Sequence, residues 1–205
     1  YFVLREGAPD FDTILCGGQA GADIELAENV EITTAAYWRN FDHYADSGAS
    51  PRGNNRPLDR VPAFGVIGLS NALNFEAFGQ PVGLLFEWAH NCHEKDRTPL
   101  YSGDNDAYYA GVRVGRSKAQ GDWQVRYAYA VVQANSVPGY FVDSDFGHGN
   151  RRGHVLRGQY KLLDSLTAGM NLFLTEPVFS PTTDSGSSPF EDRTFTLQAD
   201  LIWKF

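Results

Sequence analysis

The chain ends with the stretch Arg193-Thr194-Phe195-Thr196-Leu197-Gln198-Ala199-Asp200-Leu201-Ile202-Trp203-Lys204-Phe205, whose residues alternate in polarity. From Phe195 onward every second residue is apolar, and the residues between them are polar except Ile202. Side chains of a strand point alternately to its two faces, so this segment has one apolar and one polar face. The pattern predicts a half-buried final strand, in either a soluble sheet or a membrane barrel.

Composition narrows the classes of protein that fit. The 205 residues are enough for a single all-β domain. Aromatic residues make up 14% of the chain, yet no run of about 18 apolar residues exists, which excludes a helical membrane span. The net charge of −8 argues against a nucleic-acid partner. Two cysteines, Cys16 and Cys92, leave one disulfide or two free thiols open, and no cofactor is indicated.

Alternation of apolar and polar residues recurs throughout the chain. Between Trp123 and Val131 the odd positions are aromatic or aliphatic, whereas the even positions are polar or alanine. No segment shows a sustained helical period. The alternation predicts nine strands, over residues 12–25, 30–40, 64–77, 81–91, 106–117, 122–134, 152–163, 166–176 and 193–205.

The connections between these strands alternate in length. The short ones are 26–29, 78–80, 118–121 and 163–165, and the long, polar ones are 41–63, 92–105, 135–151 and 177–192. Short turns at one rim and long loops at the other are typical of bacterial outer-membrane barrels. The sequence therefore predicts an all-β, antiparallel transmembrane β-barrel with up-and-down meander topology. The closing aromatic Phe205 is similar to the C-terminal insertion signal of such barrels.

This topology fixes the expected orientation. With a periplasmic C-terminus and extracellular long loops, residues 1–11 are expected to be the remnant of an extracellular loop. Bacterial barrels normally have an even number of strands, with both termini in the periplasm. Nine visible strands therefore predict that residues 1–205 form one barrel domain that is the C-terminal part of a larger barrel. The alternative is that residues 1–5 form a short tenth strand.

Several short motifs resemble one family. They are Asn74-Phe75-Glu76, Gln80-Pro81, Leu85 to Asn91, Gly121 to Tyr129, Asp143 to Gly147, Gly153 to Leu156 and Tyr160 to Leu162. Together they are similar to the C-terminal half of the family called putative porins, over most of residues 12–205. The resemblance implies an outer-membrane barrel longer than this chain. It carries no catalytic signature.

In such a barrel the polar face lines the lumen and the apolar face meets lipid. The residues expected to line the pore are Glu87, Arg113, Gln124, Arg126, Arg157, Gln159, Lys161, Asn171, Gln198 and Asp200, with Thr196 and Lys204 beside them. The residues expected in the aromatic girdles are Trp203 and Phe205 near the inner rim, and Trp38 and Trp88 toward the outer rim. Four inward basic residues suggest a mild anion preference; the alternative is a lumen without selectivity.

The leading functional hypothesis is an outer-membrane porin, a passive diffusion channel for small hydrophilic solutes. The alternative is a plugged barrel that anchors or scaffolds a partner protein; a soluble ligand-binding barrel, with apolar faces inward, is the third. The loop 41–63 either folds into the lumen as a constriction or packs on the rim. Expected partners are outer-membrane lipid and, through the last strand, the barrel-assembly machinery, with a homo-oligomer left open.

Metal and catalytic sites are the weaker hypotheses. His90-Asn91-Cys92-His93 offers donors for zinc or copper but has no marked distant partner. Asp143-Ser144-Asp145 resembles a calcium loop without its bidentate glutamate, and its simpler interpretation is a turn with Asx hydrogen bonds. His154 has no nucleophile motif near it. We therefore assign no metal ligand and no catalytic residue, and do not expect an enzyme.

Overall fold

The fold is an antiparallel sheet, seen here in a computed structural model that describes residues 2–5, 13–44, 63–93, 104–178 and 193–205. Among these residues the one helical element is the 3-10 helix η3 (Gly139–Phe141), and no helix is long and apolar enough to span a membrane. The strands are β1 (Phe2–Arg5), β2 (Thr13–Ala27), β3 (Val30–Asp42), β4 (Phe64–Ala77), β5 (Gln80–Asn91), β6 (Asp106–Gly115), β7 (Trp123–Val132), β8 (Arg151–Leu163), β9 (Leu166–Pro177) and β10 (Thr194–Trp203).

Every strand pairs with its neighbours in the sequence, in the order β1 to β10. The predicted all-β antiparallel meander is confirmed, and all nine predicted strands are present with ends shifted by a few residues. The tenth strand, β1, pairs with β2, so Phe2–Arg5 is a strand, as the alternative predicted, and is not part of the expected loop 1–11. Residues 6–12 lie outside the described part of the chain. In the described chain β1 and β10 are the free edges of an open sheet.

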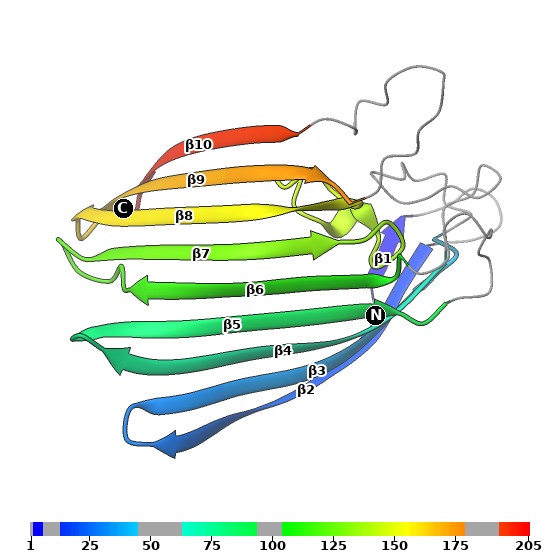
Figure 1. Cartoon of the computed structure of the whole chain (residues 1–205), viewed down its shortest axis with the longest axis horizontal. Coiled ribbons are helices and arrows are strands. Elements are labelled where there is room, and N and C mark those ends of the chain that lie inside the picture. Colours follow the sequence, from blue (N-terminus) through cyan, green and yellow to red (C-terminus); the bar gives the residue numbers. More distant parts are fainter. Residues whose placement is uncertain (1, 6–12, 45–62, 94–103, 179–192) are drawn as a thin grey trace.

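The short turns lie at one end of the sheet, and the strand ends from which the long connections leave lie at the other (Figure 1). The turn between β4 and β5 consists of Phe78 and Gly79, both at positive φ (55° and 71°). Two central residues with positive φ make a type I′ turn, whose twist matches that of the flanking strands. The C-terminus lies at the short-turn end, where the Lys204 amide donates to the Ser165 carbonyl at 2.8 Å.

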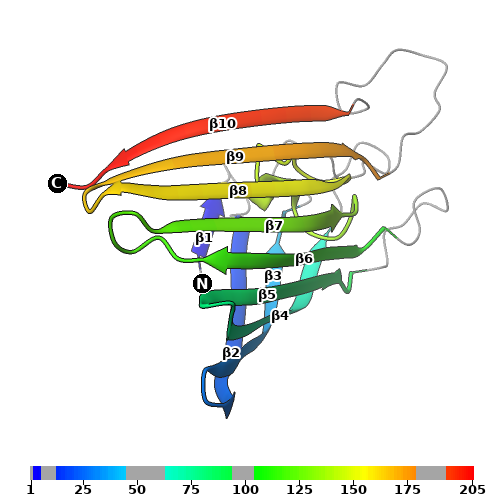
Figure 2. The same ribbon diagram turned by 60° about the vertical axis from the view of Figure 1, so that its left-hand side comes forward.

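The sheet curls strongly. Figure 2 shows that β2, β3 and β4 run across the direction of β6 to β10. Residues 133–150, which connect β7 to β8, fold back over one face of the sheet; we call this segment the strap. The strap's Phe146 packs on β9 at Phe173, and its Phe141 ring lies 5.4 Å from the Phe41 ring of β3. A segment that contacts both β3 and β9 lies on the concave side, which we call the inner face.

The buried apolar core therefore sits between the strap and the inner face. One cluster packs Phe41, Tyr44 and Phe64 in edge-on ring contacts at the long-connection end. The other packs Phe146 against Phe173 and its neighbours on β7 and β8. In the second cluster the small residues Ala128 and Ala130 of β7 leave room for the Phe146 ring.

The described short turn 116–122 depends on Asp122. The Asp122 carboxylate accepts hydrogen bonds from the Lys118 amide at 3.1 Å and the Ala119 amide at 3.0 Å. These two backbone bonds, with a smaller contribution from Arg116, hold the pKa of Asp122 below its ordinary 3.8. A lowered pKa means that the carboxylate stabilises the turn above the ordinary pKa, and that this contribution is lost as the pH falls through the lowered value.

The variant Asp122→Asn tests this turn. It keeps an acceptor oxygen but loses the charge, and charge-assisted bonds are about twice as strong as neutral ones. We expect the Lys118 and Ala119 amides to exchange hydrogen severalfold faster in the variant than in the native protein at pH 7. Equal exchange rates would show that the carboxylate does not hold the turn.

Candidate functional site

All ten residues predicted to line a pore lie on the inner face of the sheet. Residues paired across neighbouring strands share a face, and the strap packs on that face at Ala128 and Val155. From these two positions the strand register assigns all ten residues to the inner face: Glu87, Arg113, Gln124, Arg126, Arg157, Gln159, Lys161, Asn171, Gln198 and Asp200.

Five of the ten belong to one polar row that crosses seven strands in register. The row starts at Asn74 on β4 and passes through Gly83, where the space beside the glycine is filled by Arg113 of β6. The Arg113 guanidinium Nη2 reaches across Gly83 and donates to Asn74 Oδ1 at 2.9 Å. In strand order the row is Asn74, Gly83, Arg113, Arg126, Arg157, Asn171 and Gln198.

The next inner row toward the short turns is also polar. Gln124 pairs with Gln159, which pairs with Gly169, which pairs with Asp200. Gln159 and Asp200 are exposed to solvent, as is Arg157 in the first row. Because these two adjacent rows carry polar groups in contact with solvent, the part of the inner face toward the short turns is hydrophilic. Lys161, nearest the short turns, is buried and donates from Nζ to the Asp164 carbonyl at 2.9 Å.

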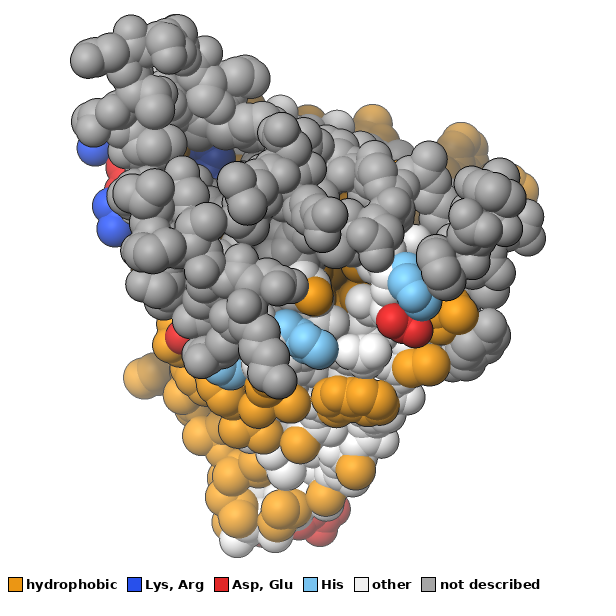
Figure 3. Space-filling view, turned by 90° about the vertical axis from the view of Figure 1, so that its right-hand side faces the viewer, with side chains coloured by type: hydrophobic (Ala, Val, Ile, Leu, Met, Phe, Trp, Pro, Cys, Tyr) orange, Lys and Arg blue, Asp and Glu red, His pale blue; other side chains and the backbone are white. Residues whose placement is uncertain are grey.

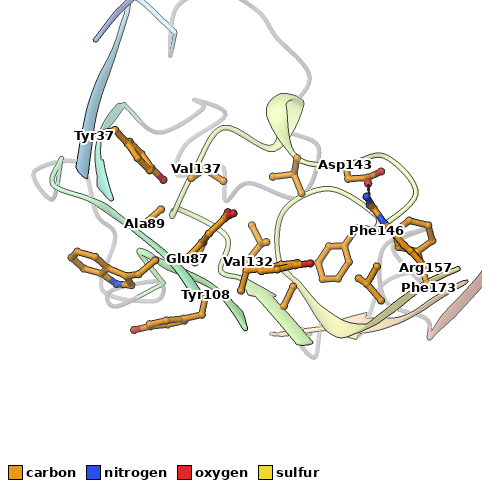
Figure 4. A pocket seen from close by; sticks show the side chains of 16 residues that line it. Tyr37, Glu87, Ala89, Tyr108, Val132, Val137, Asp143, Phe146, Arg157 and Phe173 are labelled. Atoms are coloured by element: carbon orange, nitrogen blue, oxygen red, sulfur yellow. Dashed lines mark hydrogen bonds and ion pairs between the residues drawn. The ribbon is translucent and has the colours of Figure 1, made fainter. Parts of the chain in front are cut away.

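Beneath the strap the inner face holds a hollow of about 310 Å³. In Figure 4 the strap residues Asp143 and Phe146 lie beside Arg157 and Phe173. The Arg157 Nη2 donates to Asp143 Oδ2 at 3.2 Å, which ties the strap to the polar row. The strap therefore narrows the space over the inner face at the level of Arg157.

The outer face is apolar. Its large exposed side chains include Leu84, Phe86, Tyr127, Met170, Leu197 and Leu201, which alternate with the inward residues of the same strands. Figure 3 shows hydrophobic side chains gathered in the lower part of that view, where β2 to β5 lie, with few charges among them. Contiguous exposed apolar surface of this extent indicates contact with lipid or protein rather than water.

Three of the four predicted girdle residues, Trp38, Trp88 and Trp203, lie near the two ends of the outer face. Trp38 is half exposed near the long connections, and Trp203 is 71% exposed near the short turns. Phe205 lies beyond β10 at the short-turn end and is fully exposed. Three further aromatic residues that were not among the predicted girdle residues lie at the same two levels: Tyr108 pairs with Trp88, and Trp123 pairs with Tyr160. Each of the three occupies an outward position of its strand's alternating pattern, and this could have identified them from the sequence.

Trp88 belongs to a polar group at the long-connection end of the outer face. Its indole Nε1 donates to Asp106 Oδ1 at 3.0 Å, and His90 Nδ1 lies 2.9 Å from the same oxygen. The Trp88 and His90 rings are stacked, with centroids 5.9 Å apart. A tryptophan with a satisfied N–H beside apolar surface suits a membrane interface.

The structure does not assemble His90, Cys92 and His93 around a common point. His90 is engaged by Asp106, whereas the His93 ring packs against Gly65. Within the described ranges no group of three histidine, cysteine or acidic side chains could hold a metal ion. Cys16 and Cys92 are both free thiols.

The Asp143–Asp145 motif belongs to the strap. The Asp145 amide donates to Asp143 Oδ1 at 2.9 Å, which is the Asx hydrogen bond that the simpler interpretation predicts. The other carboxylate oxygen of Asp143 faces Arg157. His154 lies on the outer face, with Nδ1 at 2.8 Å from the Tyr127 hydroxyl, away from the inner polar rows. Residues 45–62, which include most of the loop considered as a constriction, lie outside the described part of the chain.

Comparison with known proteins shows the family of this chain. No curated protein and no solved structure matches the chain. The profile of the family described as putative porin matches residues 78–191, more than half of the chain, from the β4–β5 turn to beyond β9. The matched region contains the strap, the three arginines of the polar row and most of the motifs on which the resemblance depended. The chain therefore belongs to the putative porin family.

Proposed function

We propose that this chain forms part of the wall of an outer-membrane pore through which small hydrophilic solutes diffuse. The observation that carries the proposal is the polarity of the curled sheet. Its convex outer face exposes large apolar side chains, whereas two rows of polar side chains cross its concave inner face. A soluble ligand-binding barrel has the opposite arrangement, because its apolar side chains face inward.

The orientation in the membrane follows from the two ends of the sheet. Outer-membrane barrels place short turns in the periplasm and long loops outside the cell. The C-terminus would then be periplasmic, at the end that carries the exposed Trp203 and Phe205. The free edge of β10 would be closed by another strand or engaged by the assembly machinery, since an open edge cannot remain unpaired in lipid.

The strap would act as the constriction of this pore. It lies across the inner face from β3 to β9, at the long-connection end where solutes would enter from outside. Its contacts with the wall are both apolar, through Phe146, and charged, through Asp143 and Arg157. A constriction held at both ends would limit the size of the solutes that pass.

Liposome swelling tests the proposal. Vesicles containing the protein expressed from its complete gene are placed in isotonic solutions of neutral sugars of increasing size. We expect swelling that falls steadily from monosaccharides to trisaccharides, because a narrow water-filled pore admits solutes by size. Swelling no faster than in vesicles without protein would contradict a diffusion pore.

A further inference from the structure

Three arginines stand side by side in the polar row, one on each of three neighbouring strands. Arg113 of β6 pairs directly with Arg126 of β7, which pairs directly with Arg157 of β8. Directly opposed residues in an antiparallel sheet have Cβ atoms about 5 Å apart, and like charges at this spacing destabilise the sheet. An unbroken run of three cations is therefore costly unless negative charge is supplied from elsewhere.

The described part of the chain supplies little of that negative charge close to the three arginines. Arg157 has a carboxylate partner, Asp143 of the strap, at 3.2 Å. Arg113 donates to a neutral amide oxygen of Asn74, and Arg126 lies over the Tyr109 ring at 5.2 Å. The Arg126 Nε atom is buried without a hydrogen-bond partner. Within the described ranges, two of the three cations therefore have no carboxylate within ion-pair distance.

The other carboxylates on the described part of the inner face lie in other rows or on distant strands of the same row. In the same register row Glu25 and Glu31 lie on β2 and β3, separated from Arg113 by Asn74 and Gly83. Glu87 is paired with Tyr109, toward the long connections. Asp200 lies in the next row toward the short turns, beside Asn171, whose Nδ2 is 3.5 Å from its Oδ2. The wall is thus acidic over β2 and β3 and basic over β6 to β8.

The hollow beneath the strap adjoins this basic stretch. Arg157 lines the hollow and also belongs to the row, so the two share a boundary. Apolar side chains form most of the rest of the hollow, with Phe146 and Phe173 beside Arg157 (Figure 4). Two carboxylates also line it: Asp143, which is paired with Arg157, and Glu87 on the β5 side. A solute entering from the long-connection end would meet this mainly apolar hollow first, and then the cations of the polar row on the side of the short turns.

We propose that Arg113, Arg126 and Arg157 form an anion-binding site, which makes the pore selective for small organic acids with a carboxylate and a short apolar body. The carboxylate accepts hydrogen bonds from the guanidinium groups that have no anionic partner among the described residues, and the apolar body occupies the hollow beneath the strap. Arginine suits this task because its planar donors match a carboxylate in pairs. This inference rests on the proposed pore function and adds the class of solute.

Reversal potentials in planar bilayers test the charge preference. With a potassium chloride gradient across the full-length protein, we expect chloride to be about threefold or more as permeant as potassium, because cations in a narrow pore concentrate anions. Arg126→Gln should bring this ratio down, and the double variant Arg113→Gln with Arg126→Gln should bring it close to about one. Arg152→Gln is the matched control, since Arg152 lies on the outer face, 2.9 Å from Glu176, and should leave the ratio unchanged.

Benzoate and benzamide test the class of solute. They have nearly the same shape, but only benzoate is charged. We expect millimolar benzoate to reduce the chloride current through the native channel at least about tenfold more strongly than benzamide does, and the difference to vanish in the double variant. A cation-selective native channel, or equal block by the two compounds, would overturn the anion site while leaving the pore intact. Silence from inserted, folded native protein would overturn the pore and the site together.

Discussion

Replacing Leu156 with arginine is expected to prevent stable insertion of the sheet into a bilayer. Leu156 lies on the outer face of β8, between Tyr127 of β7 and Leu172 of β9, at about the middle of the strand. An arginine on the lipid-facing surface of a barrel at the bilayer midplane costs about 2–4 kcal/mol. We expect Leu156→Arg to lower the free energy of unfolding, measured by urea titration in lipid vesicles, by that amount.

The matched control places the same residue on the other face of the same strand. Gln159 is exposed on the inner face, paired with Gln124 and Gly169. Because this face is solvated, Gln159→Arg is expected to change the free energy of unfolding by less than about 1 kcal/mol. The opposite result, a tolerated Leu156→Arg and a disruptive Gln159→Arg, would show that the apolar face points inward, as in a soluble barrel.

Truncating Phe146 is expected to release the strap. The Phe146 side chain is only 4% exposed and fills the space between Phe173, Val155 and the alanines of β7. Phenylalanine-to-alanine changes at buried sites cost about 3–5 kcal/mol, which exceeds what the exposed Asp143–Arg157 ion pair could retain. We expect the strap to leave the inner face in Phe146→Ala and the single-channel conductance to rise by about 1.5-fold or more.

Tyr140→Ala is the control for this experiment. Tyr140 is on the same strap but is 55% exposed, so its truncation removes an aromatic ring without emptying a buried site. We expect its conductance to equal that of the native protein. If Phe146→Ala folds, becomes sensitive to proteolysis within the strap and still conducts as the native protein does, the strap is not the constriction.

The strands could be predicted because their polarity pattern is local. Alternation from Trp123 to Val131 defines both faces of β7 without reference to any other strand, and the same holds for β8 to β10. The short strand β1 was harder to assign, since four residues contain too few alternations to outweigh the interpretation as a loop.

The arginine row could be predicted only in part. The alternation places Arg113, Arg126 and Arg157 on one face, but their common level depends on the register of two hairpins. That register is set by the conformations of two connections, the turn around Asp122 and the strap. The alternation of polarity within a strand carries no information about either connection. A one-residue shift at either connection would separate the three cations.

The strap could not be predicted from its sequence pattern. Residues 133–150 have no strand or helix period, and their isolated aromatics, such as Phe141 and Phe146, resemble those of any polar loop. Their position on the inner face depends on the small residues of strands that are distant in sequence, among them Ala128 and Ala130. Long-range packing of this kind leaves no local signal.

The single-channel conductance of the full-length protein in a planar lipid bilayer tests the central claim, that the inner face lines a water-filled pore. The polar rows and the hollow beneath the strap predict stepwise current increments that vary linearly with voltage. Protein shown to be folded and inserted that passes no current would contradict this claim, and the sheet would then belong to a barrel with a closed lumen.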